Sequence, residues 1–167
     1  MITIIDYGVG NINAFVNVYK RVDVTVKIAK TAADLEGAEK LILPGVGHFD
    51  HAMNQLNNSG MREKLDDLVL NQKIPVIGIC VGMQMMANNS DEGEVEGLKW
   101  IDATVKKFDE TKIHQVTRLP HMGWNDVKPV KDISLFQGLE KEAIFYFLHT
   151  YYFHCNQAQD ILAVSEY

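Results

Sequence analysis

In the first half of the chain, short apolar runs alternate with stretches in which apolar and polar positions are mixed. Short apolar runs rich in β-branched residues predict buried strands, and the amphipathic stretches between them predict helices. The predicted strands cover residues 2–5, 22–29, 40–43 and 74–79. The predicted helices include residues 12–21 and 61–70. Strands that alternate with helices indicate an α/β fold, with an open, mainly parallel sheet and helices on both faces.

The pattern changes after residue 97. Short strand-like segments then follow one another without long helices, which favours a short antiparallel extension of the main sheet. These segments are residues 98–108, 116–119, 123–127 and 143–153. Residues 88–97, between the two halves, are polar and acidic, and we interpret them as a solvated surface loop and not as a metal site.

Composition narrows the class of protein. A chain of 167 residues with 47% hydrophobic content predicts one domain, residues 1–167, with a core large enough to fold unaided. A formal net charge of −6 argues against general nucleic-acid binding. The sequence shows neither an apolar run of about 20 residues nor a basic signal region, so we expect a cytoplasmic protein. Two cysteines provide no disulfide framework, and reactivity becomes their more interesting role.

Cys80 stands where a nucleophile would be expected. It follows the predicted strand 74–79, which we expect to be central and covered on both faces, and it lies between Gly78 and Gly82. Glycines on both flanks allow the sharp strand-to-helix turn of a nucleophile elbow, and the helix start favours a thiolate. A buried, inert cysteine between packing glycines is an equally weighted alternative for this motif alone.

Residues 43–47, with the sequence Leu-Pro-Gly-Val-Gly, follow the predicted strand 40–43 as Cys80 follows the predicted strand 74–79. In a doubly wound sheet this loop could face the cysteine and stabilise an oxyanion through its amides, together with the amide of the residue after the nucleophile. The alternative is a plain strand-to-helix turn. The predicted oxyanion residues are Gly45, Val46, Gly47 and Val81.

Two other motifs give weaker indications of a binding site. Residues 8–11 form a glycine loop after the first strand, but Asn13 replaces the third glycine of a dinucleotide site, so we interpret the loop as a tight structural or substrate-facing turn. His48, Asp50 and His51 suggest a metal site, although polar residues at this place more often cap a helix or face solvent.

Five motifs, in this order, resemble those of the class I glutamine amidotransferases, and among them the glutaminase subunits of imidazole glycerol phosphate synthase. The resemblance runs nearly end to end and implies a flavodoxin-like fold. It implies hydrolysis of L-glutamine without a cofactor and transfer of ammonia to a synthase partner of (β/α)₈ type in a heterodimer. The motifs are residues 6–11, 43–47, 78–84, 120–125 and 146–151.

The resemblance also assigns roles. Cys80 would be the nucleophile that forms a glutamyl thioester, with the loop at Gly45 as oxyanion donor. Trp124 and Tyr146 would lie at the partner interface near the ammonia passage, although a core position for Trp124 is an equal alternative. The residues implied to bind substrate are Gly82, Gln84, His149, Thr150 and Tyr151.

One departure from the family pattern limits these expectations. The family takes its general base and orienting carboxylate from a His-Pro-Glu motif, and none of the six histidines here precedes Pro-Glu. Without a base, a cysteine glutaminase loses several orders of magnitude in rate. We favour a truncated chain over a shortened homologue, and expect an open sheet edge and reduced stability.

Other functions stay open at this stage. A paralogue that supplies ammonia for surface-sugar amination would share these motifs. An inactive scaffold subunit would keep the partner surface without the chemistry. A stand-alone cysteine hydrolase or redox sensor would keep the elbow but would not need the cluster at residues 120–125.

Overall fold

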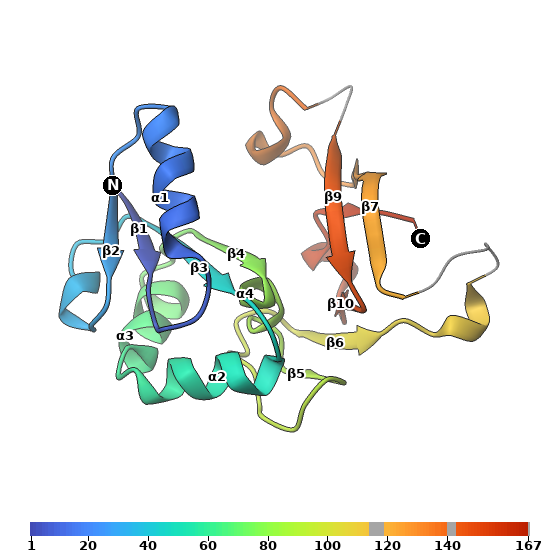
Figure 1. Cartoon of the computed structure of the whole chain (residues 1–167), viewed down its shortest axis with the longest axis horizontal. Coiled ribbons are helices and arrows are strands. Elements are labelled where there is room, and N and C mark those ends of the chain that lie inside the picture. Colours follow the sequence, from blue (N-terminus) through green and yellow to red (C-terminus); the bar gives the residue numbers. More distant parts are fainter. Residues whose placement is uncertain (114–118, 140–142, 167) are drawn as a thin grey trace.

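The main sheet has four parallel strands in the order β2-β1-β3-β4 (Figure 1). The computed structural model describes residues 1–113, 119–139 and 143–166. The strands are β1 (Ile2–Ile5), β2 (Val26–Ala29), β3 (Lys40–Gly45) and β4 (Val76–Cys80). The predicted α/β architecture is confirmed.

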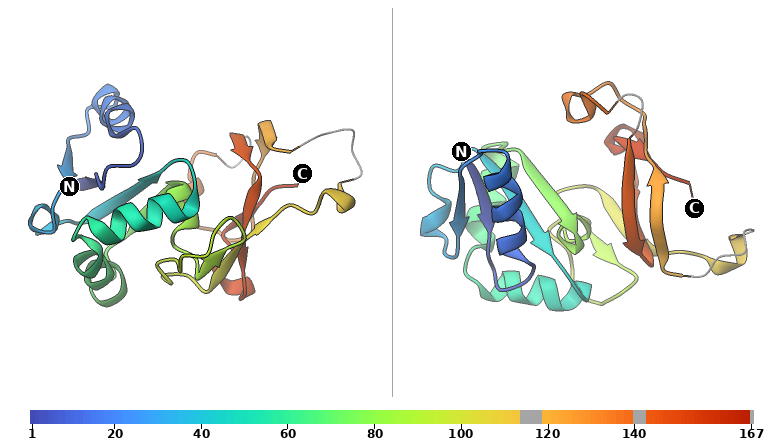
Figure 2. Two further views of the ribbon diagram at one scale, coloured as in Figure 1. Left: turned by 60° about the horizontal axis from the view of Figure 1, so that its bottom comes forward. Right: turned by 45° about the horizontal axis from the view of Figure 1, so that its top comes forward.

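Helices lie on both faces of this sheet (Figure 2). Helix α1 (Ile12–Arg21) lies on one side, and α2 (Phe49–Asn58) and α3 (Arg62–Asp66) lie on the other. The predicted helix 61–70 becomes α3 followed directly by the π-helical turn η2 (Asp67–Asn71). A single turn, α4 (Val81–Gln84), follows β4. No helix among the described residues is long and apolar enough to cross a membrane. The 3₁₀ turns are η1 (Ala33–Leu35), η3 (Glu110–Lys112), η4 (Ser134–Phe136) and η5 (Ala158–Asp160).

The core is concentrated between the sheet and α2. Phe49, Met53 and Leu56 project from α2 and are fully buried against Ile5 and Leu43 of the sheet. Burial of each such side chain contributes about 2 kcal/mol. In contrast, no residue of α1 is fully buried, so this helix covers the other face only in part.

The position of β4 differs from the prediction. We expected a central strand covered on both faces, but among the described residues β4 pairs only with β3 and forms an edge of the sheet. Ile77 and Ile79 are 43% and 36% exposed. The physical reason is that β1 and β3 occupy the interior, and nothing in the described chain pairs with the far side of β4. An apolar sequence indicates a strand that is suited to burial, but not which strand is central.

The second half forms three small sheets, in the orders β10-β6-β5, β11-β8 and β7-β9. All of their pairings are antiparallel except β5 with β6, which confirms the predicted antiparallel extension in outline. The strands are β5 (Asn89–Ser90), β6 (Ala103–Lys107), β7 (His121–Asp126), β8 (Lys128–Pro129), β9 (Ile144–His149), β10 (Tyr151–Cys155) and β11 (Ala163–Val164).

Several predicted strands change their limits. The second strand begins only at Val26, because the N–H groups of Val22 and Val24 bond to the Tyr19 carbonyl and extend the end of α1. The segment predicted at residues 143–153 divides at Thr150 into β9 and β10, which belong to different sheets. The prediction for residues 116–119 lies outside the described residues except for Leu119, which is not in a strand.

The acidic segment 88–97 is more than a solvated loop. Asp91 Oδ2 accepts a hydrogen bond from the Lys107 N–H, and Glu92 Oε2 accepts one from the Phe49 N–H, each at 2.9 Å. The second bond satisfies a free amide at the start of α2, which no backbone carbonyl of that helix can reach. The interpretation as a solvated loop was therefore wrong for Glu92, which is half-buried, whereas Asp91 is exposed as predicted and also makes a structural hydrogen bond.

Candidate active site

Cys80 lies at a strained backbone position. It is the last residue of β4 and the cap of α4, with φ 55° and ψ −122°, and it is exposed. A non-glycine residue with positive φ is uncommon and costs of the order of 1–3 kcal/mol, so the surrounding structure must enforce it. This conformation is the sharp strand-to-helix turn that the Gly-x-Cys-x-Gly spacing predicts.

The two flanking glycines allow the turn to pack backbone against backbone. A Cβ on Gly78 would lie 2.4 Å from Met83 Cα, and one on Gly82 would lie 2.0 Å from the Leu43 carbonyl oxygen. Both distances are far below van der Waals contact. The glycines are therefore required by the close approach of α4 to the ends of β3 and β4.

The loop predicted to hold an oxyanion adjoins the cysteine. Gly45 pairs with Cys80 in the parallel register, and a Cβ on Gly45 would lie 2.3 Å from the Gly82 nitrogen. Val46 and Gly47 are exposed, and Gly47 has a φ of 83°. The structure thus places the backbone of Gly45 next to the elbow, and Val81 follows Cys80 as the first residue of α4.

The helix that follows the cysteine is shorter than predicted. Helix α4 spans four residues, so the macrodipole behind Cys80 is much smaller than that of a full helix. Gln84, at the end of α4, is 9% exposed.

Tyr7 joins this site, and sequence reasoning did not identify it. Its side chain is buried, and its hydroxyl donates a hydrogen bond of 2.7 Å to the carbonyl of Pro44, the residue before Gly45. Burial raises the pKa of Tyr7. A Cβ on Gly10 would lie 3.0 Å from Pro44 Cβ, so the glycine loop 8–11 is a turn packed on the same segment. The sequence signal that could have identified Tyr7 is an aromatic residue with a hydroxyl, two residues after the first strand and next to the glycine loop.

Two histidines form a directional pair between β7 and β9. His149 Nδ1 lies 2.7 Å from the Tyr151 carbonyl oxygen, so it must donate. When His149 is neutral, its Nε2 then accepts from His121 Nδ1 at 2.9 Å. Burial, assisted by the neighbouring His149, lowers the pKa of His121. This pair fixes the position of the predicted pocket residue His149.

Thr150 and Tyr151 form the corner between β9 and β10. The Thr150 carbonyl accepts a hydrogen bond of 3.1 Å from the Phe108 N–H. Tyr151 packs against a buried cluster that contains Ala87, three residues after Gln84. Within the described residues, no hydrogen bond joins residues 149–151 to the elbow at Cys80. The corner therefore packs on a cluster that includes a residue shortly after α4.

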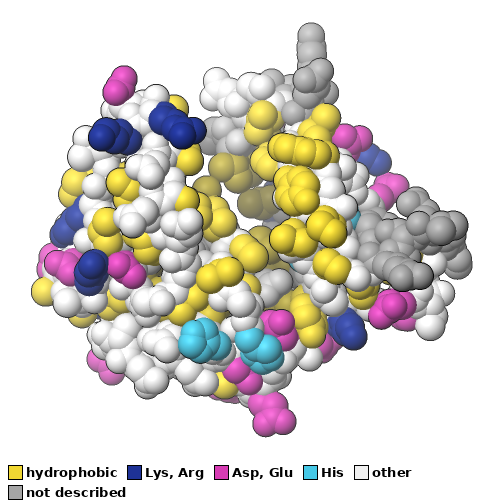
Figure 3. Space-filling view, viewed as in Figure 1, with side chains coloured by type: hydrophobic (Ala, Val, Ile, Leu, Met, Phe, Trp, Pro, Cys, Tyr) yellow, Lys and Arg dark blue, Asp and Glu magenta, His cyan; other side chains and the backbone are white. Residues whose placement is uncertain are grey.

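The strands β7 and β9 expose an apolar face. Trp124 is 74% exposed and contacts Tyr146 edge to face, with ring centroids 5.6 Å apart. The register places Met122 opposite Leu148 and Trp124 opposite Tyr146 on this face. Figure 3 shows hydrophobic side chains gathered along the lobe where Figure 1 draws these strands. Trp124 is thus a surface residue, as the contact alternative predicted.

Two of the three residues considered for a metal, His48 and Asp50, have structural contacts. His48 Nδ1 accepts from the Asp50 N–H at 3.2 Å at the start of α2. The Asp50 carboxylate accepts from the N–H groups of Glu94 and Val95. Among the described residues, no group of three or more potential ligands could hold a metal ion.

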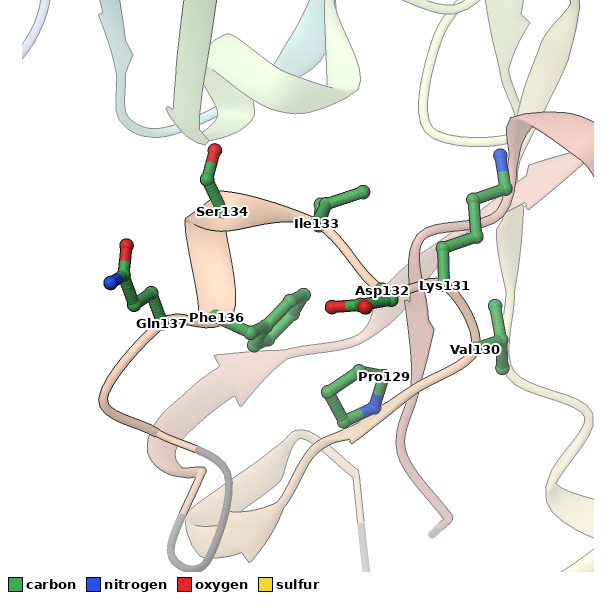
Figure 4. Close-up of a pocket in the computed structure, with 8 residues that line it drawn as sticks. All are labelled: Pro129, Val130, Lys131, Asp132, Ile133, Ser134, Phe136 and Gln137. Atoms are coloured by element: carbon green, nitrogen blue, oxygen red, sulfur yellow. The ribbon is translucent and has the colours of Figure 1, made fainter.

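A shallow pocket lies elsewhere in the chain. Figure 4 shows it between β8 and η4, lined by residues of the single segment 129–137. It includes Lys131 and Asp132 but none of the residues predicted to act in catalysis or binding. We therefore place the candidate active site at the elbow.

The chain is similar to known sequences along its whole length. A family model described as "Glutamine amidotransferase class-I" matches residues 3–167. The "Imidazole glycerol phosphate synthase subunit HisH" of Bdellovibrio bacteriovorus is 56% identical over all of this chain and 82% of its own length. The subunit of the same name from Leptospira borgpetersenii is 48% identical over the same shares.

Solved structures share the fold. A crystal structure of a glutamine amidotransferase aligns with a TM-score of 0.70 and 17% identity, over 97% of this chain and 78% of the other. A glutamine amidotransferase from Thermotoga maritima aligns with a TM-score of 0.57 and 18% identity, over 93% and 63% of the two chains.

Proposed function

Because the chain belongs to the class-I glutamine amidotransferase family, we propose that it is the glutaminase subunit of an imidazole glycerol phosphate synthase in histidine biosynthesis. The observation that carries the proposal is the exposed Cys80 at a strained elbow beside the backbone of Gly45. The names of the two relatives described above support the choice of acceptor.

The elbow supports acyl transfer through a covalent intermediate. The Cys80 sulfur attacks the carboxamide carbon of glutamine, and the carbonyl oxygen becomes an oxyanion held by amides of residues 45–47 and of Val81. The C–N bond then breaks, ammonia leaves with an added proton, and a glutamyl thioester forms. Water hydrolyses the thioester to glutamate. Gly82, Gln84 and residues 149–151 are proposed to hold the substrate.

The proton transfers need a base that the described residues do not bring to Cys80. We propose that a base on a further strand, paired with the open edge of β4, supplies it in the role that the His-Pro-Glu motif has in the family. The unpaired edge of β4 supports this proposal, since such a strand would satisfy its free backbone groups. The chain alone would then turn over glutamine slowly.

The exposed face of β7 and β9 is proposed to bind the synthase partner. Trp124 and Tyr146 lie at its centre, and large exposed aromatic residues are typical of interface hot spots. The partner would be a (β/α)₈ synthase that receives the ammonia, in a cytoplasmic heterodimer whose joint reaction includes a lyase step. The same exposed face, together with the missing base, would also suit a catalytically inactive scaffold subunit.

The test is labelling by a glutamine-analogue electrophile, followed by mass spectrometry of the adduct. We expect modification at Cys80 and none at Cys155, whose thiol is half-buried and has its pKa raised by burial and by Asp160. Iodoacetamide, which lacks the amino-acid part, provides the control for general thiol reactivity. No analogue adduct at Cys80, with or without the synthase partner, would exclude the glutaminase and favour the scaffold.

A further inference from the structure

The corner between β9 and β10 joins two sheets, and each sheet fixes the direction of one peptide group. The Val127 N–H donates to the Ala143 carbonyl at 2.7 Å, one pair beyond the β7–β9 register. Hydrogen-bonded pairs alternate along an antiparallel ladder, so His149 exchanges its backbone bonds with His121. The His149 carbonyl therefore points toward β7, and the Thr150 N–H, in the same planar peptide group, points away from β7.

The pairing of β10 with β6 fixes the next amide. The Phe108 N–H donates to the Thr150 carbonyl at 3.1 Å, so the following pair, Tyr151 with Lys107, exchanges no backbone bonds. The Lys107 N–H agrees with this, since it donates to Asp91. The Tyr151 N–H points away from β6, the one described strand that pairs with β10. Two successive amides, of Thr150 and Tyr151, thus have no acceptor in the described sheets.

The angle between these two amides depends on the backbone torsions of Thr150, which belongs to neither strand. The His149 side chain limits these torsions. Its Nδ1 donates to the Tyr151 carbonyl at 2.7 Å, and this bond closes a ring that contains both φ and ψ of Thr150. Among the described residues, it is the one hydrogen bond that crosses the corner from β9 to β10.

The imidazole of His149 is also held at its other end. Its Nε2 lies 2.9 Å from Nδ1 of the buried His121, and its ring centroid lies 5.3 Å and 5.4 Å from those of Phe108 and Phe147. The ring cannot turn away from the Tyr151 carbonyl without losing the bond to His121 as well. The side chain that spans the corner is therefore fixed in direction.

We propose that His149 is a positioning residue, whose imidazole sets the angle between the Thr150 and Tyr151 amides that receive L-glutamine. The proposal rests on the proposed glutaminase function, in which residues 149–151 hold the substrate. The imidazole itself does not touch the substrate. Loss of its Nδ1 donor weakens glutamine binding, because the two amides then occupy a range of angles of which only a part fits the ligand.

Two substitutions separate the two ends of the imidazole. The side-chain amide of asparagine reaches the place of Nδ1, and that of glutamine reaches the place of Nε2. His149→Asn therefore keeps a donor for the Tyr151 carbonyl, whereas His149→Gln keeps an acceptor for His121 and loses the bond across the corner. A role in packing alone would not distinguish the two variants.

The measurement is the rate of Cys80 alkylation by iodoacetamide at increasing concentrations of L-glutamine, followed by mass spectrometry. In this reaction an S–C bond forms, the C–I bond breaks, iodide leaves and the thiol proton passes to solvent. Protection by L-glutamine gives its dissociation constant. The rate without L-glutamine reports the thiol at the elbow, which does not depend on the corner and should be equal in all variants.

We expect His149→Gln to bind L-glutamine about five- to tenfold more weakly than the wild type, as for the loss of one hydrogen bond. His149→Asn, the conservative variant, should recover most of this affinity. His154→Gln removes an exposed imidazole from β10 and is the matched control, with no change in protection.

Equal losses in His149→Asn and His149→Gln would mean that the ring acts through packing, and no loss in His149→Gln would mean that the corner bond does not serve binding. Either result overturns the positioning role. Failure of L-glutamine to protect wild-type Cys80 would instead overturn the proposed function. The imidazole ¹⁵N shifts of the wild type at about pH 8, above the ordinary histidine pKa, test the bond without any substitution. They should show the proton of His149 on Nδ1, and a proton on Nε2 alone would contradict the proposal.

Discussion

The two halves of the chain differ in how they bury their apolar side chains. All described hydrophobic residues that are buried lie at or before Val105. Beyond it, Met122, Trp124 and Leu148 are 60% to 74% exposed, on strands that among the described residues pair only with each other. An isolated two-stranded sheet is at best marginally stable. The first half therefore supports the elbow by itself, whereas the second half carries the residues proposed for the pocket and the interface on strands that leave apolar side chains exposed.

The largest effect should come from filling the contact between the elbow and β3. Gly82→Ala places a Cβ 2.0 Å from the Leu43 carbonyl oxygen, where only backbone could move aside. We expect a loss of more than about 3 kcal/mol in the free energy of unfolding, measured by urea denaturation. Gly60→Ala is the control: it meets nothing within 4 Å but has φ +74°, and should cost about 1 kcal/mol. Equal losses would show that the first half is not rigid at the elbow.

Hydrogen exchange tests the comparison directly. Amides of β7 and β9 should exchange about 100-fold faster than those of β1 and β3, because few buried contacts hold the second half closed. Both sets are observed in one protein sample, so Leu41 and Ile42 serve as internal references. Protection of residues 143–164 equal to that of the main sheet would contradict the difference between the halves.

The sequence predicts the parts of the site that depend on local signals. The helix from Ile12 to Arg21 has the predicted limits, and the elbow at Cys80 has the geometry that its two glycines indicate. The spacing of apolar residues and the glycines of a tight turn are local features that span a few residues, so both can be recognised in the sequence.

Long-range pairs explain what the sequence does not predict. The Tyr7 hydroxyl and the Pro44 carbonyl are 37 residues apart, and His121 and His149 are 28 residues apart. Neither pair has a spacing rule, because tertiary packing brings the partners together. The edge position of β4 is likewise set by which strands are present to pair, and an apolar run reads the same at an edge or in the centre.

A smaller effect tests how completely the first half is packed. Thr3 is fully buried in β1, and its hydroxyl has no hydrogen-bond partner among the described residues. Thr3→Val keeps the shape and removes the unpaired group, so stability should rise by about 1 kcal/mol. The control Thr31→Val removes a hydroxyl that donates to Asp34 Oδ2 at 2.9 Å and should lower stability. A loss in Thr3→Val would indicate a polar contact within the first half.

The smallest effect concerns pH and should be confined to the second half. His121 has its pKa lowered in the folded protein, first by burial and then by the neighbouring His149, so the unfolded chain binds the proton more readily. Its contribution to stability is then complete above the unfolded pKa of about 6.5 and is lost as the pH falls through the folded pKa. The effect on stability is small, because the folded and unfolded states differ by less than one proton bound to this imidazole at any pH.

Exchange rates between pH 7 and 5, corrected for the intrinsic pH dependence of amide exchange, provide the measurement. Acid should speed the opening of β7 and β9 relative to β1 and β3. The variant His121→Gln should reduce this difference in how strongly the exchange rates depend on pH. His154→Gln, at an exposed position of β10, is the matched control and should leave it unchanged. An equal acid response in β1 and β3 would mean that the His121–His149 pair is coupled to the main sheet, and that the two halves open together.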